Sequence, residues 1–190
     1  MACRSCTTRK AAKEKVESLD VLINNAGVAI YDDLTNIDVI EQHLAVNFLG
    51  PLKMTQAFLP LLKRSKGAVV NNLSMVALAP LPVVPAYSIS KAAAFNMTQS
   101  LRALLAGQGI TVHAVVLGPV DTDMNRGFEI PKASTESAAI GIFDGLDKGD
   151  DEIFPDPASA AIAEGWRAGV VKATERQFAS FVSQSAATAE

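Results

Sequence analysis

The chain is poor in cysteine, in long apolar runs and in net charge, and each shortage excludes a class of protein. Two cysteines among 190 residues are too few for a disulfide scaffold, so we expect a reducing, cytoplasmic setting. No run reaches the length of about 18 apolar residues that a membrane-spanning helix needs. A net charge of −3 gives no reason to expect nucleic acid or an acidic membrane surface as a partner.

The first residues are basic and contain no glycine. Residues 1–18 also lack the apolar core of a secretory signal. Five of the first fifteen residues are Lys or Arg, which fits either an organelle transit peptide or a helix from Lys10 to Ser18, and we favour the helix. Cys3 and Cys6 have the spacing of redox and zinc sites, but no second ligand pair accompanies them. We interpret them as having no functional role.

Short apolar runs alternate with long helical patterns along the rest of the chain. The apolar runs predict strands at 19–23, 68–73, 111–117 and 151–154. The helical patterns predict helices at 38–62 with a bend at Gly50-Pro51, at 86–105 and at 136–146, and from Asp156-Pro157 to about Val182. Apolar strands that alternate with helices are typical of a parallel sheet covered on both faces. We therefore predict an α/β fold in a single domain, residues 1–190.

Small and polar residues follow three of the predicted strands. Residues 24–27 (Asn-Asn-Ala-Gly) follow the first strand, Ser74 follows the second, and residues 118–122 follow the third. In parallel α/β sheets, ligands bind beyond the carboxyl ends of the strands. The sequence therefore predicts a binding site at this edge of the sheet.

Tyr87 and Lys91 stand four residues apart, and Ser74 precedes the tyrosine by thirteen. On a helix, residues four apart share a face, so the phenol and the ammonium point the same way. A free tyrosine has a pKa of about 10, and a nearby cation lowers that pKa. Such a phenol can give or take a proton at a carbonyl or alcohol oxygen, which the Ser74 hydroxyl can hold in place. The alternative reading is a lysine stem packed beside a half-buried ring.

Taken together, these segments resemble the short-chain dehydrogenase/reductase family. Residues 19–27 are similar to the family's fourth strand and its Asn-Asn-Ala-Gly turn, residues 46–50 to the segment with its helix asparagine, and residues 118–124 to the loop that closes over the nicotinamide. The resemblance begins at about Ala11 and weakens after Gly127. It implies a Rossmann-type doubly wound parallel sheet.

Two departures from the family pattern stand out. Leu117 replaces the proline that usually precedes the glycine of the third segment, which frees one backbone angle. No glycine-rich turn precedes Asn24, so we expect a sheet that lacks the first strands and has residues 19–23 at its edge. Without that turn, no helix amino-terminus is available for the cofactor pyrophosphate, and we expect weak cofactor binding.

The resemblance assigns four catalytic roles. Tyr87 would be the acid or base, and Lys91 would lower its pKa and hold the ribose next to the nicotinamide. Ser74 would orient the substrate oxygen, and Asn47 would hold a water that links Lys91 to solvent. The alternatives are a strand-end cap for Ser74 and a bond from Asn47 to the helix backbone at the bend.

The resemblance also implies a nicotinamide cofactor, NADP or NAD. The backbone of residues 25–27 would approach the adenosine side closely because the side chains there are small. Val120 and Thr122 would meet the carboxamide and the phosphates, whereas Asp121 and Asp123 cap the backbone or face solvent. The expected cofactor-binding set is Asn25, Ala26, Gly27, Tyr87, Lys91, Gly118, Val120 and Thr122.

The expected substrate is a small apolar carbonyl or alcohol, because residues 75–90 carry no charged side chain. Apolar side chains there and in the following variable loop would line and cover it: Val76, Leu78, Val83, Val84, Met124, Phe128 and Ile130. Helices 38–62 and 86–105 resemble those that pair subunits in the family, which implies a homo-oligomer, although amphipathic helices also pack within one chain. We interpret His43, His113 and Trp166 as structural.

Three functions compete at this point. The leading one is an oxidoreductase that interconverts a carbonyl and an alcohol. The second is a non-catalytic fragment or pseudoenzyme that acts through its oligomerisation helices. The third is a flavodoxin-like signalling domain, which fits the sheet but leaves Ser74, Tyr87 and Lys91 unexplained.

Overall fold

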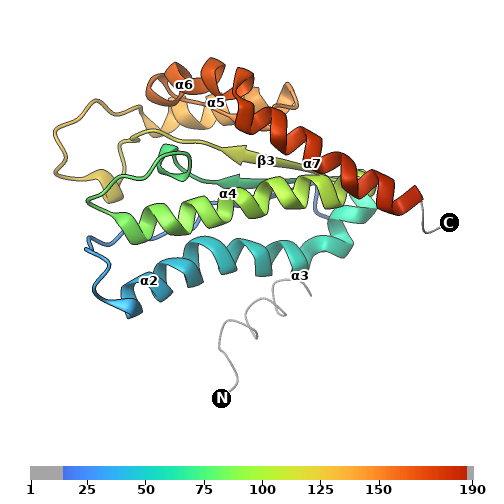
Figure 1. The fold of residues 1–190 in the computed structure, drawn as a ribbon, viewed down its shortest axis with the longest axis horizontal. Helices are drawn as coiled ribbons and strands as arrows, with labels where there is room; N and C mark the ends of the chain where they lie inside the picture. The colour runs from blue at the N-terminus through green and yellow to red at the C-terminus, as the bar shows by residue number, and fades with distance from the viewer. Residues whose placement is uncertain (1–14, 188–190) are drawn as a thin grey trace.

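A computed structural model describes residues 15–187 of the chain, and Figure 1 shows its fold. Cys3, Cys6 and most of the predicted helix 10–18 lie outside the described residues. Four strands form one parallel sheet in the order β1-β2-β3-β4. Their bounds are β1 Val21–Asn24, β2 Ala68–Asn72, β3 Thr111–Val115 and β4 Glu152–Ile153. The predicted parallel α/β sheet is confirmed.

One long helical segment connects β1 to β2. It consists of α2 (Ile37–Leu44), a π-helical turn η1 (Ala45–Leu49) and α3 (Gly50–Ser65). The bend predicted at Gly50-Pro51 takes the form of this wider turn. Proline has no N–H and its ring crowds the carbonyl four residues earlier, so Pro51 disfavours α-helical bonding at Asn47.

The second half of the chain alternates helices with strands. The short turn η2 (Met75–Ala77) precedes the long helix α4 (Pro85–Ala106), which ends at Gly107 as predicted. A second short turn, η3 (Asp123–Asn125), follows β3. Helix α5 (Thr135–Asp147) precedes β4. The helix predicted from 156 to 182 is two helices, α6 (Pro157–Ala168) and α7 (Val170–Ala187). Gly169 between them is extended, with φ −74° and ψ 152°, so the single-helix prediction was wrong there.

The core lies on both faces of the sheet. On one face, Leu22, Val69 and Val112 pack against α3 and the end of α4, and further along it Phe95 of α4 meets Trp166 of α6 edge to face. On the other face, a smaller apolar cluster packs against α5; its buried members are Val70, Val115 and Ile153. The α2–α3 segment and α4 lie side by side in Figure 1, with the loops that follow the strands gathered at the left.

Strand β1 forms one edge of the four-stranded sheet. Leu22 points into the α3 face and is buried, whereas Val21 and Ile23 on the opposite face are 40% and 46% exposed. The edge position expected for this strand is confirmed.

A buried ionic cluster fixes α7 to the sheet. The Lys172 ammonium has a side chain only 1% exposed and lies 2.9 Å from Glu152 and 2.8 Å from Glu175. Arg102 of α4 lies 2.9 Å from the same Glu152 and 2.6 Å from Glu175. The Trp166 indole also donates to Glu152, so α4, β4, α6 and α7 share one set of charges.

Removing one charge from this cluster should destabilise the fold strongly. We expect Lys172→Ala to lower the free energy of unfolding by about 3–5 kcal/mol, because Glu152 is left buried beside too little positive charge. Urea denaturation followed by Trp166 fluorescence measures this loss. Arg126→Ala is the control: its pair with Asp123 is exposed, so it should cost less than about 1 kcal/mol. Equal, small losses in both variants would contradict the account.

Candidate active site

The parallel register brings the loops after β1, β2 and β3 to one end of the sheet. The Met75 N–H donates to the Leu117 carbonyl at 2.8 Å, and Leu73 N–H donates to the Val115 carbonyl at 2.8 Å. The segment that carries Ser74 is therefore fixed against β3 and its following loop. Helix α4 begins at this same end, so Tyr87 and Lys91 in its first two turns face the strand ends.

Lys91 is buried at the carboxyl end of β2. Its ammonium donates to the Asn72 carbonyl at 2.8 Å and lies 5.6 Å from the centre of the Tyr87 ring. Burial lowers the pKa of Lys91 from 10.5 to about 8, because a charged ammonium is costly away from water. An ammonium has three donors, and two remain after the bond to Asn72.

Ser74 lies near Tyr87, and a side-chain hydrogen-bond interaction with Ser74 acts to lower the pKa of the Tyr87 phenol. Burial raises the pKa of Tyr87 above 10.0, and the interaction with Ser74 offsets only part of this. The loss of hydration is the larger of these two effects, because burial penalises a charged phenolate. The predicted lowering of this pKa by Lys91 stays a proposal. Ser74 also caps the turn η2 by accepting the Val76 N–H, so the cap alternative is confirmed and the catalytic role stays a proposal.

Asn47 is buried in the π-helical turn, and its side chain makes three hydrogen bonds. Its amide donates to the Val28 carbonyl and to the Ser90 hydroxyl, both at 2.9 Å, and its oxygen accepts the Val28 N–H at 2.9 Å. The backbone-bonding alternative is thus realised, though with the loop after β1 rather than with its own helix. A water relay through Asn47 stays a proposal.

The turn after β1 lies against Asn47 and Lys91. A Cβ at Gly27 would stand 3.3 Å from the Asn47 oxygen and 3.6 Å from the Lys91 nitrogen, so glycine allows the backbone to approach both. Asn25 and Ala26 are exposed, and the Asn25 oxygen accepts from the Asn72 amide at 2.6 Å. Gly27 is thus brought next to Lys91, and Asn25 contacts Asn72, whose carbonyl accepts from Lys91.

The loop after β3 is held by α6. The Gly118 N–H donates to the Asp156 carboxylate at 2.8 Å, and a Cβ at Gly118 would stand only 2.4 Å from that carboxylate. Val120 is buried, and its carbonyl accepts from the Asn125 amide. Thr122 is exposed, and its hydroxyl makes only a long hydrogen bond, of 3.4 Å, to the same Val120 carbonyl. Asp121 and Asp123 face solvent as expected.

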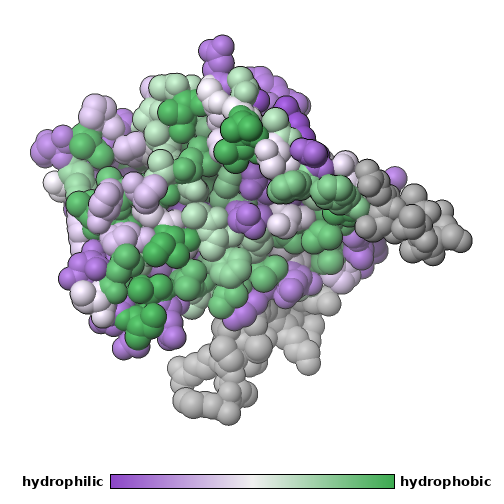
Figure 2. Space-filling view, in the orientation of Figure 1, coloured by the Kyte–Doolittle hydropathy of each residue, from purple (hydrophilic) through white to green (hydrophobic). Residues whose placement is uncertain are grey.

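Several apolar side chains are exposed around the start of α4. Val83 is 56% exposed, Met124 45%, Phe128 39% and Ile130 48%, and the rings of Tyr31 and Phe128 meet with centroids 6.2 Å apart. Figure 2 shows apolar surface at this loop end of the molecule. The predicted covering loop and the loop after β1 therefore meet in front of the site.

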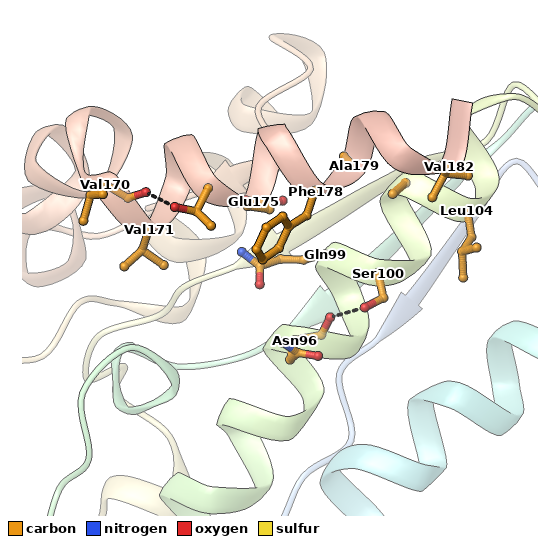
Figure 3. Close-up of a pocket in the computed structure, with 12 residues that line it drawn as sticks. Asn96, Gln99, Ser100, Leu104, Val170, Val171, Glu175, Phe178, Ala179 and Val182 are labelled. Carbon is orange, nitrogen blue, oxygen red and sulfur yellow. Dashed lines mark hydrogen bonds between the residues drawn. The ribbon is translucent and has the colours of Figure 1, made fainter. Parts of the chain in front are cut away.

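A separate groove of about 590 Å³ runs between α4 and α7 (Figure 3). Its walls are largely apolar and include Leu104, Val171 and Phe178. None of the predicted site residues lines it, so it is separate from the candidate site.

Four polar residues near the site were missed or undervalued in the sequence. Asn71 and Asn72 close β2; the Asn71 oxygen accepts from Asn24 at 2.8 Å and its amide donates to Thr98 of α4 at 2.9 Å. Two amides at the end of an apolar strand were the available signal. The Asn72 group that accepts the hydrogen bond from Lys91 is its backbone carbonyl. Every residue has such a carbonyl, so the sequence gives no signal for this contact. His43 and Asp32 also contact this region, although His43 had been interpreted only as structural.

The residues present fit a nicotinamide cofactor. The buried Lys91 ammonium keeps two free donors, and the Asn72 side-chain oxygen is buried without a hydrogen-bond partner. Both lie beside the small residues 25–27, where backbone can approach a ligand closely. Among residues 15–187, no group of three or more metal-ligating side chains is found, and no helix is long and apolar enough to cross a membrane.

Comparison with known proteins decides the family. The sequence profile described as short chain dehydrogenase matches residues 6–132. The chain belongs to the short-chain dehydrogenase family. It is similar to estradiol 17-beta-dehydrogenase 2 of Rattus norvegicus, with 38% identity over 117 residues that cover 60% of this chain and 31% of the rat protein.

Two solved structures of this family's fold are similar as well. One is a short chain dehydrogenase from Burkholderia cenocepacia J2315 in complex with NADP, with 34% identity and a TM-score of 0.79 over 85% of this chain and 72% of that one. The other is an NADPH-bound carbonyl reductase from chicken fatty liver, with 27% identity and a TM-score of 0.67 over 74% of this chain and 63% of that one. The chain spans about a third to a half of the length of the curated relatives it matches, for example 31% and 53%.

The buried Lys91 should make stability depend on pH in a defined direction. Its pKa is about 8 in the folded chain against 10.5 as a free side chain, so between these values the unfolded chain binds more protons. Well below pH 8, Lys91 is protonated in both the folded and the unfolded chain and adds no pH dependence to stability. As pH rises from about 8 toward the unfolded value, the folded chain loses the proton first, and the free energy of unfolding increases by up to about 3 kcal/mol.

Lys91→Met isolates this effect because it removes the titrating group and keeps an unbranched stem. Urea denaturation across the same pH range should show the wild type gaining stability relative to Lys91→Met as pH rises. Parallel pH curves for the two proteins would contradict the burial of a charged Lys91.

Proposed function

We propose that this chain carries the proton-transfer half of a short-chain dehydrogenase and interconverts a carbonyl and an alcohol with NADP or NAD. The observation that supports this best is the joint placement of Ser74, Tyr87 and Lys91 at the strand ends, with Gly27 packed against the lysine. The NADP and NADPH complexes of the two similar structures support the choice of cofactor. We further propose that residues 1–190 form a single domain.

Each residue has a distinct task in the proposed reaction. The bound nicotinamide would supply or accept the hydride. Ser74, which lies near the phenol, would hold the substrate oxygen beside Tyr87, which would pass its proton to that oxygen in reduction and take it back in oxidation. The high pKa of Tyr87 keeps the phenol protonated, which suits reduction. Lys91 would bind the ribose hydroxyls with its two free donors.

The remaining roles follow from position. The backbone of Asn25 and Ala26 would meet the adenosine side, and the exposed Thr122 would meet the phosphates. Gly118 is bonded to Asp156 and Val120 is buried, so we propose that these two residues position the loop after β3 next to the cofactor. We also propose that Asn47 holds a water near Lys91, since both flank Gly27.

Tyr87→Phe is the direct test of the proposed chemistry. We expect the rate of ketone reduction with NADPH to fall about 100- to 10,000-fold, because general acid catalysis is lost while the ring still packs. The measurement is kcat from NADPH oxidation, with the urea midpoint as evidence that the variant is folded. Tyr31→Phe is the matched control, since that ring is exposed at the mouth of the site.

The substrate is proposed to be a small apolar ketone or alcohol. The uncharged segment 75–90 and the exposed side chains of Val83, Met124 and Phe128 support this. The name of the rat relative, an estradiol dehydrogenase, agrees with an alcohol substrate. Turnover of a small acid much faster than of an apolar ketone would overturn the proposal, whatever the effect of Tyr87→Phe.

A homo-oligomer belongs to the same proposal. Ile89 and Leu104 of α4 are 44% and 56% exposed, and Phe178 of α7 is 61% exposed across the groove of Figure 3. Apolar side chains along one helix face are suited to pairing with a second copy. We propose that the α2–α3 segment and α4 form this surface. A cytoplasmic compartment and the absence of a nucleic-acid partner are also proposed, supported by two cysteines and a net charge of −3.

Light scattering tests the assembly. We expect a particle mass at least twice the 20.0 kDa of the chain, and a shift to a single chain in Leu104→Asp because a carboxylate would be buried unpaired. Phe143→Asp is the control, since that side chain is equally exposed on α5 at 55% but lies away from the proposed surface. A wild type that is monomeric at micromolar concentration would contradict the proposal.

A further inference from the structure

Residues 28–32, here called the bridging segment, link the turn after β1 to the start of α4. Two side chains from other elements hold it, and one of its own side chains binds α4. Asn47 binds both backbone groups of Val28, and His43 of α2 accepts the Ile30 N–H at 3.0 Å. At its far end, the Asp32 carboxylate accepts the Ala86 N–H of α4 at 3.2 and 3.3 Å. The segment is therefore anchored at its start, middle and end.

Asp32 caps the helix that carries Tyr87. The first N–H groups of a helix have no partner within it, and the residue at the cap position of α4, Val84, has no side-chain hydrogen bond to offer. Asp32 supplies an acceptor from 54 residues away, and its negative charge suits a helix amino-terminus. Ala86, which receives this bond, immediately precedes Tyr87.

His43 contacts the Tyr87 ring, and the hydrogen bonds of its two ring nitrogens assign a role to each. The side chain is 0% exposed, and its Nδ1 lies 2.7 Å from the Val39 carbonyl. A carbonyl only accepts, so Nδ1 carries the proton and Nε2 is left to accept from Ile30. The ring meets the Tyr87 ring edge-on, with centroids 6.3 Å apart at 63°. One imidazole thus supports both the bridging segment and the phenol.

We propose that His43 and Asp32 are positioning residues for Tyr87, which hold the phenol by its ring and by the end of its helix. The proposal rests on the proposed function, in which Tyr87 transfers the proton. It adds that the geometry of the phenol depends on two residues outside the Ser74–Tyr87–Lys91 set. Neither contacts the reacting atoms, so each acts through Tyr87.

A titration of Tyr87 tests this without any turnover. The chain has two tyrosines, so in a Tyr31→Phe background the phenolate absorbance reports Tyr87 alone. Burial raises the pKa of this phenol. If Asp32 holds the helix end, Asp32→Ala should admit water and move the titration midpoint down toward the ordinary value of about 10. Asp32→Asn keeps an acceptor for Ala86 and should restore the wild-type midpoint.

Asp33→Ala is the matched control for Asp32. This neighbouring carboxylate bonds only within its own turn, to Thr35, so the midpoint should stay at the wild-type value. Asp32 also accepts the Leu34 N–H, a local bond of the same kind, and the Asp33 variant shows what the loss of such a bond alone does.

For the histidine, His43→Phe keeps a ring against Tyr87 and removes the bond to Ile30. We expect the midpoint to fall here too. The matched control is His113→Phe, because His113 is likewise buried and bonded through both nitrogens, but to Asp150 and Thr111. Its replacement should lower the urea midpoint without moving the titration of Tyr87, which separates positioning from general stability.

Turnover gives the second readout. In the full chain, Asp32→Ala and His43→Phe should lower kcat for ketone reduction about 10- to 100-fold, while the two control variants leave it unchanged. Midpoints and kcat values equal to those of the controls would overturn the positioning proposal. If instead the wild type reduces no carbonyl but the two variants still shift the Tyr87 midpoint, the proposed function fails and the placement of the phenol by these residues stands.

Discussion

The site depends on one buried charge, the Lys91 ammonium held by the Asn72 carbonyl at the end of β2. This bond ties the start of α4 to the end of β2, since an ammonium taken from water needs an acceptor. The Tyr87 ring lies 5.6 Å from that ammonium and is close to Ser74. Gly27 then fits between Asn47 and Lys91 because it has no side chain. Each other feature of the site is placed with respect to this contact.

The parallel sheet makes such a contact possible. Its register brings the ends of β1, β2 and β3 to the same level, and polar bonds then join neighbouring loops. The amide chain from Asn24 through Asn71 to Thr98 links the edge strand to α4 across β2. On the opposite side, Asp156 both caps α6 and holds Gly118. Backbone and side-chain bonds of this kind give the site rigid walls, while the exposed apolar loops in front of it are less constrained.

The sequence predicted the alternation of strands and helices well because buried strands and amphipathic helices have distinct periodicities. It also placed Ser74, Tyr87 and Lys91 in one site, since helical spacing and strand ends are local properties. It could not predict the break at Gly169, because an isolated glycine within a helical pattern is tolerated and does not by itself mark the end of a helix. Nor could it predict the π-helical turn at 45–49, which depends on how Pro51 is accommodated.

Three features of the candidate site could not be predicted from the sequence pattern. The direction of the Tyr87 pKa shift depends on the balance between burial and the interaction with Ser74, and burial is a property of the folded chain. The capping of α4 by Asp32 joins residues 54 apart in the sequence, with no motif to mark it. No motif marks His43 either. Its position in the sequence fits an ordinary helix, and only the folded chain brings its ring against the Tyr87 ring.

Hydride transfer itself is the most direct test of the account. The full chain would be incubated with an apolar ketone and a high concentration of NADPH that carries deuterium at both C4 positions of the dihydronicotinamide, and the product alcohol would be analysed by mass spectrometry. The expected result is one deuterium on the carbinol carbon, formed by the wild type and nearly absent with the Tyr87→Phe chain. A folded wild-type chain that yields no deuterated alcohol, or one in which the phenylalanine variant yields as much, would contradict the central claim.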